Sequence, residues 1–93
     1  MASLKLLDGS NMEEDILTEM GKLVQNAIDE NSEGEEREKR IAAKIRNTAD
    51  ENFGSVWHCV VGKSMAVAIR FQENRFAHYS FNWDWHIYIW KTL

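Results

Sequence analysis

The sequence predicts an α+β fold in which two helices pack on an antiparallel β-sheet. Up to about residue 54, apolar residues recur every three or four positions, which is the spacing of helices that bury one face. From Val56 onward the pattern becomes an alternating one, which is typical of strands. Helices that precede strands, instead of alternating with them, indicate an α+β domain. A chain of 93 residues has room for one such domain, residues 1–93.

The first helix is expected to begin at a capping box. Ser10 and Glu13 have the required spacing, and Asn11 with Glu14 offers the same chemistry one residue later. The apolar stripe of this helix comprises Met12, Ile16, Leu17, Met20, Leu23, Val24, Ala27 and Ile28. These residues fit one buried helix face.

The second helix is expected to start near residues 32–35, where Ser32 and Glu35 repeat the capping-box spacing. Its apolar stripe comprises Ile41, Ala42, Ile45, Ala49 and Phe53. Gly54 is the predicted stop. The charged run 35–40 is interpreted as a solvated helix face with ion pairs such as Glu36 with Arg40. The helical part of the domain is therefore 12–54.

Residues 55–93 are predicted to form antiparallel strands joined by short polar connectors. The four candidates are Val56 to Val61, Met65 to Phe71, Arg75 to Phe81 and Trp85 to Trp90. Residues 1–11 form a tail or a short edge strand at Leu4 to Leu7.

The last strand is apolar on both faces. Trp85, Ile87 and Ile89 point one way, and residues 86, 88 and 90 (His, Tyr and Trp) point the other way. The two helices can cover one face. The other face would be an exposed apolar patch, which marks an interface, and a second copy of the chain is the simplest cover. The alternative is a monomer with a single thick core.

Charge and aromatic residues are distributed unevenly. Residues 1–51 hold 13 of the 15 acids and 7 of the 11 bases, whereas residues 52–93 hold all ten aromatic residues. The net charge of −4 argues against a nucleic-acid partner. No apolar run approaches the roughly 20 residues needed to cross a membrane, and the N-terminus does not resemble a signal peptide. The single cysteine excludes an internal disulfide, so a cytosolic chain is expected.

The residues that could do chemistry give little support for an enzyme. His58 and Cys59 are neighbours in a predicted strand, so their side chains point to opposite faces and cannot form a dyad together. One cysteine and three histidines, with His78 and His86, lack the close pairs of a zinc site. We expect no metal and no cofactor. A thiol- or histidine-dependent enzyme that uses His78 or His86 across the sheet is the alternative.

Three segments resemble the eight-kilodalton dynein light chain family. The segment Trp57-His58-Cys59-Val60-Val61-Gly62-Lys63 is similar to the family's Trp-His-Cys-(Ile/Val)-Val-Gly-(Arg/Lys) block. Glu38-Lys39 followed by Ile41-Ala42-Ala43-Lys44-Ile45 resembles its Glu-Lys-x-Ile-Ala-Ala-x-Ile segment. Phe76 and the closing Trp90-Lys91 fit the family's last hairpin. The resemblance covers roughly residues 12 to 93.

This resemblance implies a strand-exchanged homodimer of the dynein light chain type. The strand Met65 to Phe71 would cross to the partner's sheet and border a groove on each side of the dimer. An extended client segment would add there as a further strand, in the mode called β-augmentation. The chain would then be a non-enzymatic peptide-binding hub of the microtubule motor dynein. The implied partners are the dynein intermediate chain or other extended segments, and the implied location is the cytoplasm and cytoskeleton.

The resemblance also implies roles for individual residues. The peptide groove would comprise Glu38, Lys39, Lys63, Met65, Ala66, Val67, Ala68, Ile69, Arg70, Phe71, His78 and Ser80. The dimer interface would include His58, Ser64 and Ala68. Glu38 and Lys39 match residues that meet a central glutamine of the client, and Lys63 stands at the groove's rim. His58 matches an interface histidine whose protonation favours the monomer, because a buried cation is costly.

The chain departs from the family pattern around the groove. Val67, Arg70 and Phe71 replace a serine, a threonine and a histidine, and His78 and Ser80 stand where tyrosines are expected. Because these changes remove polar contacts to Thr-Gln-Thr-like clients, a dedicated assembly subunit with one fixed partner is the alternative function. The family's proline before the Trp-His-Cys block is Ser55 here, so a trans peptide is expected at that turn.

Overall fold

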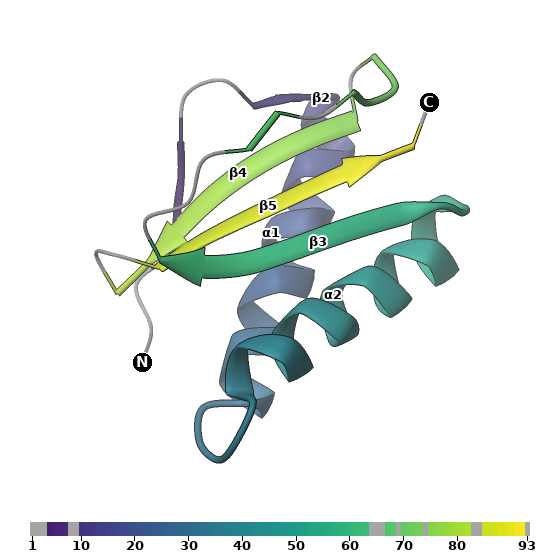
Figure 1. Cartoon of the computed structure of the whole chain (residues 1–93). Helices are drawn as coiled ribbons and strands as arrows, with labels where there is room; N and C mark the ends of the chain where they lie inside the picture. The colour runs from purple at the N-terminus through teal and green to yellow at the C-terminus, as the bar shows by residue number, and fades with distance from the viewer. Residues whose placement is uncertain are drawn as a thin grey trace.

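A computed structural model describes residues 4–7, 10–63, 67–68, 70–73, 75–82 and 85–92. Its helices lie together on one side of a single sheet (Figure 1). The elements are β1 (Leu4–Leu6), β2 (Asn11–Met12), α1 (Glu14–Glu30), α2 (Arg37–Phe53), β3 (Trp57–Lys63), β4 (Arg75–Phe81) and β5 (Trp85–Lys91). The predicted α+β fold is therefore confirmed, with helices first and the main strands after them.

The sheet is antiparallel and its strands follow the order β1-β4-β5-β3. The short β2 also pairs with β4, beyond this path. The long central strand β5 therefore lies between β3 and β4 (Figure 1). Its residue Trp90 is opposite His58 on one side and opposite Phe76 on the other. This register fixes which side chains share each face of the sheet.

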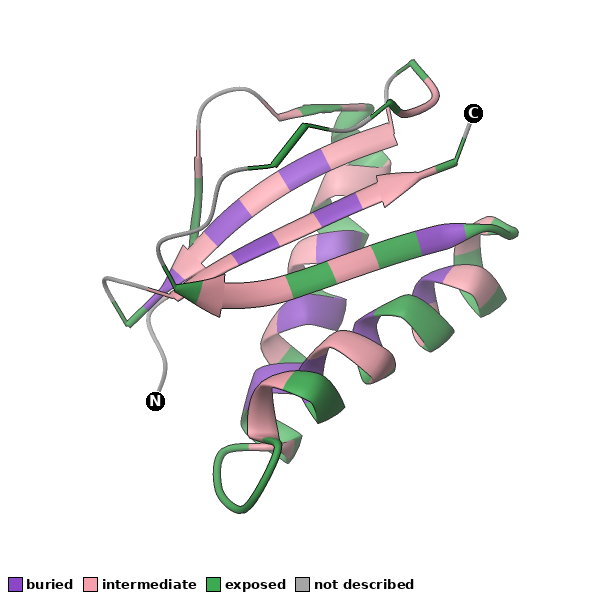
Figure 2. Cartoon of the chain, viewed as in Figure 1, coloured by how far each residue is buried: buried purple, intermediate pink, exposed green. Residues whose placement is uncertain are grey.

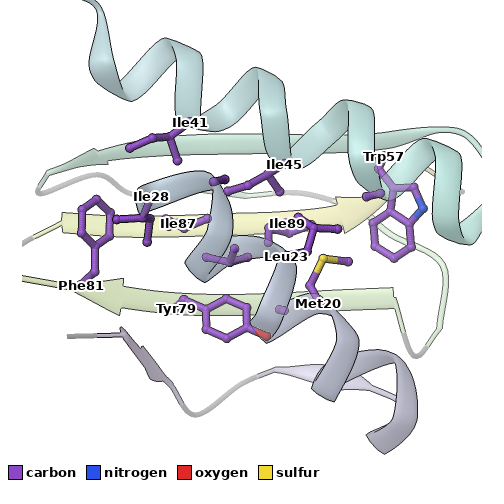
Figure 3. Packing of buried hydrophobic residues seen from close by; sticks show 14 residues of the cluster. Met20, Leu23, Ile28, Ile41, Ile45, Trp57, Tyr79, Phe81, Ile87 and Ile89 are labelled. Carbon is purple, nitrogen blue, oxygen red and sulfur yellow. The ribbon is translucent and has the colours of Figure 1, made fainter. Parts of the chain in front are cut away.

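One face of the sheet and the apolar stripes of both helices form the core (Figures 2 and 3). Because side chains alternate along a strand, every second residue of β4 and β5 enters this core. The buried residues are Met20, Leu23, Val24, Ala27, Ile28, Ile41, Ile45, Ala49, Trp57, Ala77, Tyr79, Phe81, Ile87 and Ile89. Burial of one large aliphatic side chain contributes about 1.5–3 kcal/mol, so this cluster is the main source of stability.

The connection from α2 to β3 is fixed by contacts around Trp57. Its indole is fully buried and packs edge-on against Phe53, with 6.1 Å between the ring centroids. Its backbone N–H donates to Asp50 Oδ1 at 2.8 Å. Between the two elements, Gly54 adopts a φ of 78°, which favours glycine, and ends the helix as predicted.

The two predicted capping boxes are wrong. The first helix begins after Glu13, with no capping bond from a side chain. Ser10 instead donates to the Leu7 carbonyl at 3.0 Å and accepts from the His78 N–H at 3.0 Å. The second helix begins after Glu36, also without a side-chain cap. There the Arg40 guanidinium donates to the Glu33 carbonyl. Ser10 is therefore used to join the N-terminal segment to β4, and it does not cap α1.

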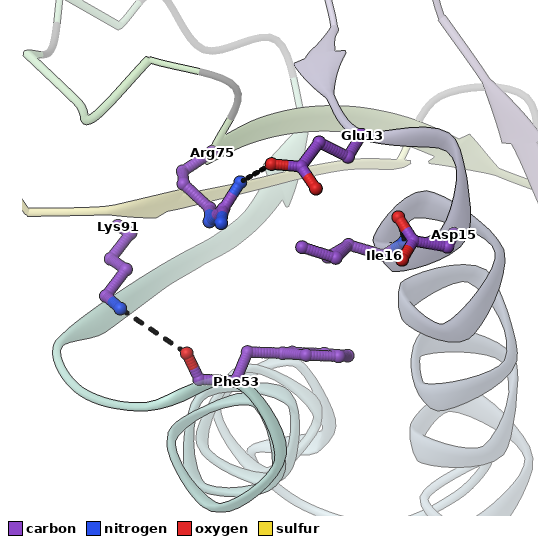
Figure 4. Close-up of polar contacts among 6 residues, drawn as sticks. All are labelled: Glu13, Asp15, Ile16, Phe53, Arg75 and Lys91. Carbon is purple, nitrogen blue, oxygen red and sulfur yellow. Dashed lines mark hydrogen bonds and ion pairs between the residues drawn. The ribbon is translucent and has the colours of Figure 1, made fainter.

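Polar contacts join the helices to the strand ends (Figure 4). Arg75 Nη1 of β4 lies 3.1 Å from Glu13 Oε1, directly before α1. Lys91 Nζ of β5 donates to the Phe53 carbonyl at the end of α2, at 3.3 Å. The carboxylate of Asp15 accepts from the Ile16 N–H at 2.9 Å, in the first turn of α1. The ion pair and the lysine contact hold the helix ends against the sheet.

The strand predictions succeed in part. The structure has β4 at the predicted residues, whereas β3 begins and ends later than expected and β5 includes Lys91. In the predicted strand 65–71, residues 67, 68, 70 and 71 are outside any strand, and residues 65, 66 and 69 lie outside the described residues. In the single chain, the described part of this segment is therefore not paired with any strand. The peptide between Ser55 and Val56 is cis, so the expected trans geometry is wrong.

The helices also bear on the membrane question. Among the residues that the structure describes, no helix combines the length and the apolar character needed to cross a membrane.

Candidate functional site

The sheet face opposite the helices is the candidate site, and we call it the open face. It comprises His58 and Val60 of β3, Phe76, His78 and Ser80 of β4, and His86, Tyr88 and Trp90 of β5. None of these residues is buried, although six of the eight have a ring. Figure 2 shows how they alternate along β4 and β5 with the buried residues of the core. The prediction that the last strand has two apolar faces is therefore confirmed.

At one end of the open face, two stacked pairs of aromatic rings form a row across neighbouring strands. The His58 ring stacks on Trp90 with 5.4 Å between centroids. On the far side of Trp90, Phe76 stacks on Phe71 at 4.9 Å. Phe71 is a predicted groove residue, and its ring thus extends the open face into the segment that follows β3. This row is an apolar surface suited to a flat partner.

Hydrogen bonds support the same end of the face. His58 Nε2 lies 2.6 Å from Thr92 Oγ1. The Thr92 N–H donates to the Val56 carbonyl at 3.0 Å, and the Thr92 carbonyl accepts from the Gln72 side chain at 2.9 Å. The Gln72 N–H donates to the Lys91 carbonyl at 3.0 Å. These bonds orient the His58 ring and tie the chain around residue 72 to the end of β5.

The middle of the open face carries two histidines in contact. His78 Nε2 and His86 Nδ1 are 3.0 Å apart, and His78 stacks on Tyr88 with 4.1 Å between centroids. Partial burial lowers the pKa of His78, and the positive charge that His86 can carry lowers it further. His78 is therefore more often neutral at a given pH than an exposed histidine.

Other predicted groove residues lie on different parts of the fold. Glu38 and Lys39 are in the first turns of α2, on the helix side of the sheet, whereas His78 and Ser80 are on the open face. Lys63 ends β3, with its ammonium 4.8 Å from the centroid of the Trp85 ring. The single chain therefore does not bring the predicted groove residues together into one site.

The segment after β3 is partly described. Val67, Ala68 and Arg70 are exposed, and Val67 is 38% exposed. Ser64, Met65, Ala66 and Ile69 lie outside the described residues. The exposed valine is an apolar group without cover in the single chain.

Cys59 has an environment that opposes nucleophilic chemistry. It is half-buried and packs against the core, on the opposite side of β3 from His58. Burial raises the pKa of the Cys59 thiol, an effect that the Arg46 charge only partly offsets. The reactive form, the thiolate, is thus scarce at neutral pH. In the described part of the chain, no three side chains of the metal-binding types are grouped to hold a metal ion.

A hollow lies on the helix side, where β1, α1 and β4 meet. It is a shallow apolar cavity of about 330 Å³. Its lining residues are Leu6, Glu14, Leu17, Thr18, Gly21, Lys22 and Tyr79. The Tyr79 hydroxyl lies 3.4 Å from the Leu17 carbonyl, so its hydrogen-bonding capacity is partly used within the fold. The cavity offers few polar groups with which to select a ligand.

Two features of the open face were missed by sequence reasoning. The His58–Thr92 contact joins residues 34 positions apart, and the pairing of His78 with His86 depends on the β4/β5 register. A signal for the second feature exists, because a short turn near residues 82–84 would place positions 78 and 86 close together on one face.

Comparison with known proteins shows that nearly the whole chain matches one family. Residues 5–92 match the model of the family described as dynein light chain type 1. The curated protein dynein light chain 1, cytoplasmic, from Candida glabrata is 23% identical over 74 residues, which is 80% of this chain and 81% of that protein.

Solved structures show the same fold at low identity. The dynein light chain-like domain of the Fasciola hepatica calcium binding protein FhCaBP2 matches in two structures, with TM-scores of 0.78 and 0.73 at 18% and 20% identity. These matches cover 97% and 98% of this chain and 92% of each domain chain. The corresponding domain of CsTAL3 has a TM-score of 0.68 at 17% identity, covering 96% of this chain and 92% of the other.

Proposed function

We propose a function that follows from a finding about the chain: it belongs to the dynein light chain type 1 family. The chain acts as a homodimer without enzymatic activity and captures extended segments of client proteins by β-augmentation. In this role it is a subunit of the microtubule motor dynein in the cytoplasm, and the dynein intermediate chain is a candidate client. Family membership supports a dynein light chain-like role, and the open face supports the dimer.

The observation that carries the proposal is the uncovered aromatic surface of the open face. Trp90, Tyr88 and Phe76 are only partly buried, although they are among the largest apolar side chains of the sheet. A soluble monomer rarely leaves such a surface in water. A second copy would cover it with an identical surface, which is how two-fold dimers are built.

The edge of the sheet at β3 supports the client role. In the described part of the chain, β3 is hydrogen-bonded to β5 along one side only. A strand can add to its other side through backbone hydrogen bonds. We assign this position to residues 65–71 of a second chain, whose own outer edge then accepts the client.

The proposed site residues keep the roles that the family resemblance implies. In the dimer, Glu38 and Lys39 of one chain meet the central glutamine of the client and form the groove with Lys63, His78 and Ser80. A second chain is needed because one chain alone separates these residues. His58 lies at the interface with Ser64 and Ala68.

The molar mass in solution tests the dimer. Light scattering at neutral pH and micromolar concentration should give the mass of two chains. A monomer mass under these conditions would overturn the dimer and, with it, the exchanged strand. Since protonation of His58 would place a charge in the interface, acidification through the histidine range should weaken the dimer. The variant His58→Gln should abolish that part of the pH dependence.

Peptide titration separates the hub from its alternative. A Thr-Gln-Thr-type peptide, titrated into the dimer by calorimetry, should bind with one peptide per chain. A scrambled peptide of the same composition is the control. If the dimer forms but no such peptide binds, a dedicated assembly subunit with one fixed partner is favoured. The replaced groove positions Val67, Arg70 and Phe71 are the observation behind that alternative.

Thiol reactivity tests the proposed lack of enzymatic activity at Cys59. In the folded protein a bulky thiol reagent should react slowly, because burial both shields the sulfur and disfavours the thiolate. The same reagent in denaturant should react fully. Rapid reaction in the folded state would revive the thiol-dependent alternative.

A further inference from the structure

We propose that the hollow between β1 and α1 docks a basic amphipathic helix of a partner protein, with an apolar side chain of that helix inserted into the cavity. The cavity has a volume of about 330 Å³, and Leu6 of β1, Leu17 of α1 and Tyr79 of β4 are among the residues that line it. This site is separate from the client groove, so the inference does not depend on the proposed function.

The position of the cavity leaves it accessible both in the single chain and in the proposed dimer. The cavity lies on the helix side of the sheet, whereas the proposed dimer covers the open face. Its strand, β1, is at the opposite end of the sheet order from β3, where the exchanged strand and the client would add. A docked helix would therefore compete neither with the second chain nor with the client.

A glycine in the middle of α1 keeps the cavity open. Gly21 lines the cavity and lies in the interior of a 17-residue helix, where glycine is the least favourable residue after proline. Packing does not require a glycine there, because an added Cβ would meet the Tyr79 hydroxyl at 3.8 Å, an ordinary contact distance. Alanine would therefore fit and stabilise the helix, whereas a larger side chain would fill the hollow. A binding role for the hollow accounts for a glycine that the fold does not need.

The walls of the cavity suit an apolar side chain. Leu6 is 42% exposed, and Leu17 and Tyr79 contribute from α1 and β4. An apolar group that enters the cavity would remove this leucine surface from water, which favours binding. Ligand pockets have volumes of roughly 300–1,000 Å³, so this one is near the lower limit. It therefore accommodates one or two side chains.

The charge around the cavity selects a basic partner. Residues 13–30, which comprise α1 and the residue before it, include six acids and one base, Lys22. Lys22 is already paired with Glu19 at 3.5 Å. Glu14 lines the cavity, and among the residues that the structure describes its carboxylate has no hydrogen-bond or ion-pair partner. A lysine or arginine next to the apolar anchor would meet this carboxylate.

A helix suits this position better than an extended strand. β1 has three residues, so a strand added to its outer edge would gain few backbone hydrogen bonds. A helix satisfies its own backbone groups and binds through the side chains of one face. A helix with apolar residues on one face and flanking lysines or arginines matches both the apolar cavity and the acidic residues around it.

Binding of a designed peptide tests the proposal. The probe is a fluorescently labelled leucine–lysine amphipathic peptide of about five helical turns, and anisotropy follows its titration with the full chain. A leucine–glutamate peptide with the same leucine positions controls for charge. The leucine–lysine peptide should bind with a dissociation constant in about the micromolar range, and the control should bind at least about tenfold more weakly. Equal affinities, or no binding of the leucine–lysine peptide, would overturn the proposal.

Gly21→Leu is the decisive variant, because it should fill the cavity without harming the helix. Its affinity for the leucine–lysine peptide should fall at least about tenfold, while its unfolding temperature should not fall below that of wild type. The matched control is Asn47→Leu, which adds the same side chain on the exposed surface of α2 and should bind like wild type. Equal affinity in wild type and Gly21→Leu would mean that charge alone attracts the peptide, and the proposal would be wrong.

NMR on wild type locates the peptide even if Gly21→Leu fails to fold. The backbone amide signals of Leu6, Thr18 and Gly21 should shift on titration, and those of Val60 and Tyr88 on the open face should not. Shifts confined to the open face would contradict the inference. Because molar mass is measured separately, a monomer that binds the peptide at the cavity contradicts only the proposed function. A dimer that binds a client but not this peptide contradicts only the present inference.

Discussion

The two faces of one sheet differ more than any other two regions of the molecule. On the helix side, Phe81, Ile87 and Ile89 are at most 1% exposed. On the open face, their neighbours along β5, Tyr88 and Trp90, remain partly exposed although they carry large aromatic rings. The difference shows that alternate residues of one strand, which face opposite sides of the sheet, have two different roles. One face stabilises the folded chain, and the other is available for association.

This separation has a direct experimental meaning. Substitutions on the helix side should change the free energy of unfolding of the single chain. Substitutions on the open face should change the association constant and leave the fold intact. The predictions below test this distinction in order of expected effect.

The largest effect is expected from Ile89→Ala on the helix side. Because Ile89 is fully buried, its truncation leaves a cavity and should lower the free energy of unfolding by about 2–5 kcal/mol. Urea denaturation, followed by circular dichroism at protein concentrations below the dissociation constant of the dimer, measures this loss. The matched variant Val60→Ala on the open face should cost less than about 1 kcal/mol. Equal costs would contradict the separation of tasks.

The next effect concerns association. Val60 is 36% exposed in the middle of β3 on the open face, so Val60→Asp would place an unpaired charge in the proposed interface. The free energy of dimerisation should weaken by about 2 kcal/mol or more, which raises the dissociation constant about thirtyfold. Sedimentation equilibrium measures it. Asn26→Asp adds the same charge on the exposed side of α1 and should leave the dimer unchanged. Loss of folded structure in Val60→Asp would show that this face also stabilises the chain.

Alkaline pH should destabilise the helix side through Tyr79. Burial raises the pKa of Tyr79 from 10.0 to about 12. Between these values the unfolded chain loses the phenol proton while the folded chain retains it, so the free energy of unfolding falls as pH rises. The loss should reach up to about 2 kcal/mol.

Denaturation across this pH range, with Tyr79→Phe as the test variant, measures the contribution. The variant should show a smaller alkaline loss than wild type. Tyr88→Phe, on the open face, is the matched control and should retain the wild-type loss. If the two variants behave alike, the two faces do not differ in the way that burial indicates.

The smallest effect is expected where α1 meets β4. Glu13 and Arg75 form an ion pair at 3.1 Å, with side chains that are 52% and 24% exposed. Solvent screens such a pair, so Glu13→Gln should lower the free energy of unfolding by less than about 1 kcal/mol. Thermal unfolding at low and high salt measures it, and Glu14→Gln, the exposed neighbouring residue in the first turn of α1, controls for the lost charge. A loss near that of Ile89→Ala would mean that this contact, and not the core, holds α1 in place.

Local patterns predict most of the fold, because spacing alone decides which residues can share a buried face. Gly54 and the strand Arg75–Phe81 are where the sequence pattern predicts them. The helix starts could not be predicted from local spacing. Ser10 has the spacing of a cap, but it bonds to His78, which is 68 positions away. Long-range contacts of this kind carry no local signal.

The site is less predictable than the fold for a physical reason. Parity along β5 predicts that His86, Tyr88 and Trp90 share a face, and the structure confirms it. The His78–His86 contact depends in addition on the register between two strands. The groove depends on residues 65–71, whose strand is absent from the described part of a single chain. A property that requires two chains cannot be read from the contacts of one.

The short strands at the N-terminus limit how this protein can assemble. β1 and β2 occupy the outer side of β4 with three and two residues, and they leave no long regular edge there. Strand addition is therefore directed to β3, on the opposite side of the sheet. A sheet that can grow from one side closes after a few strands, whereas a sheet that grows from both sides can polymerise into fibres. We therefore expect β1 and β2 to block growth of the sheet on this side, and their removal should favour open-ended aggregation.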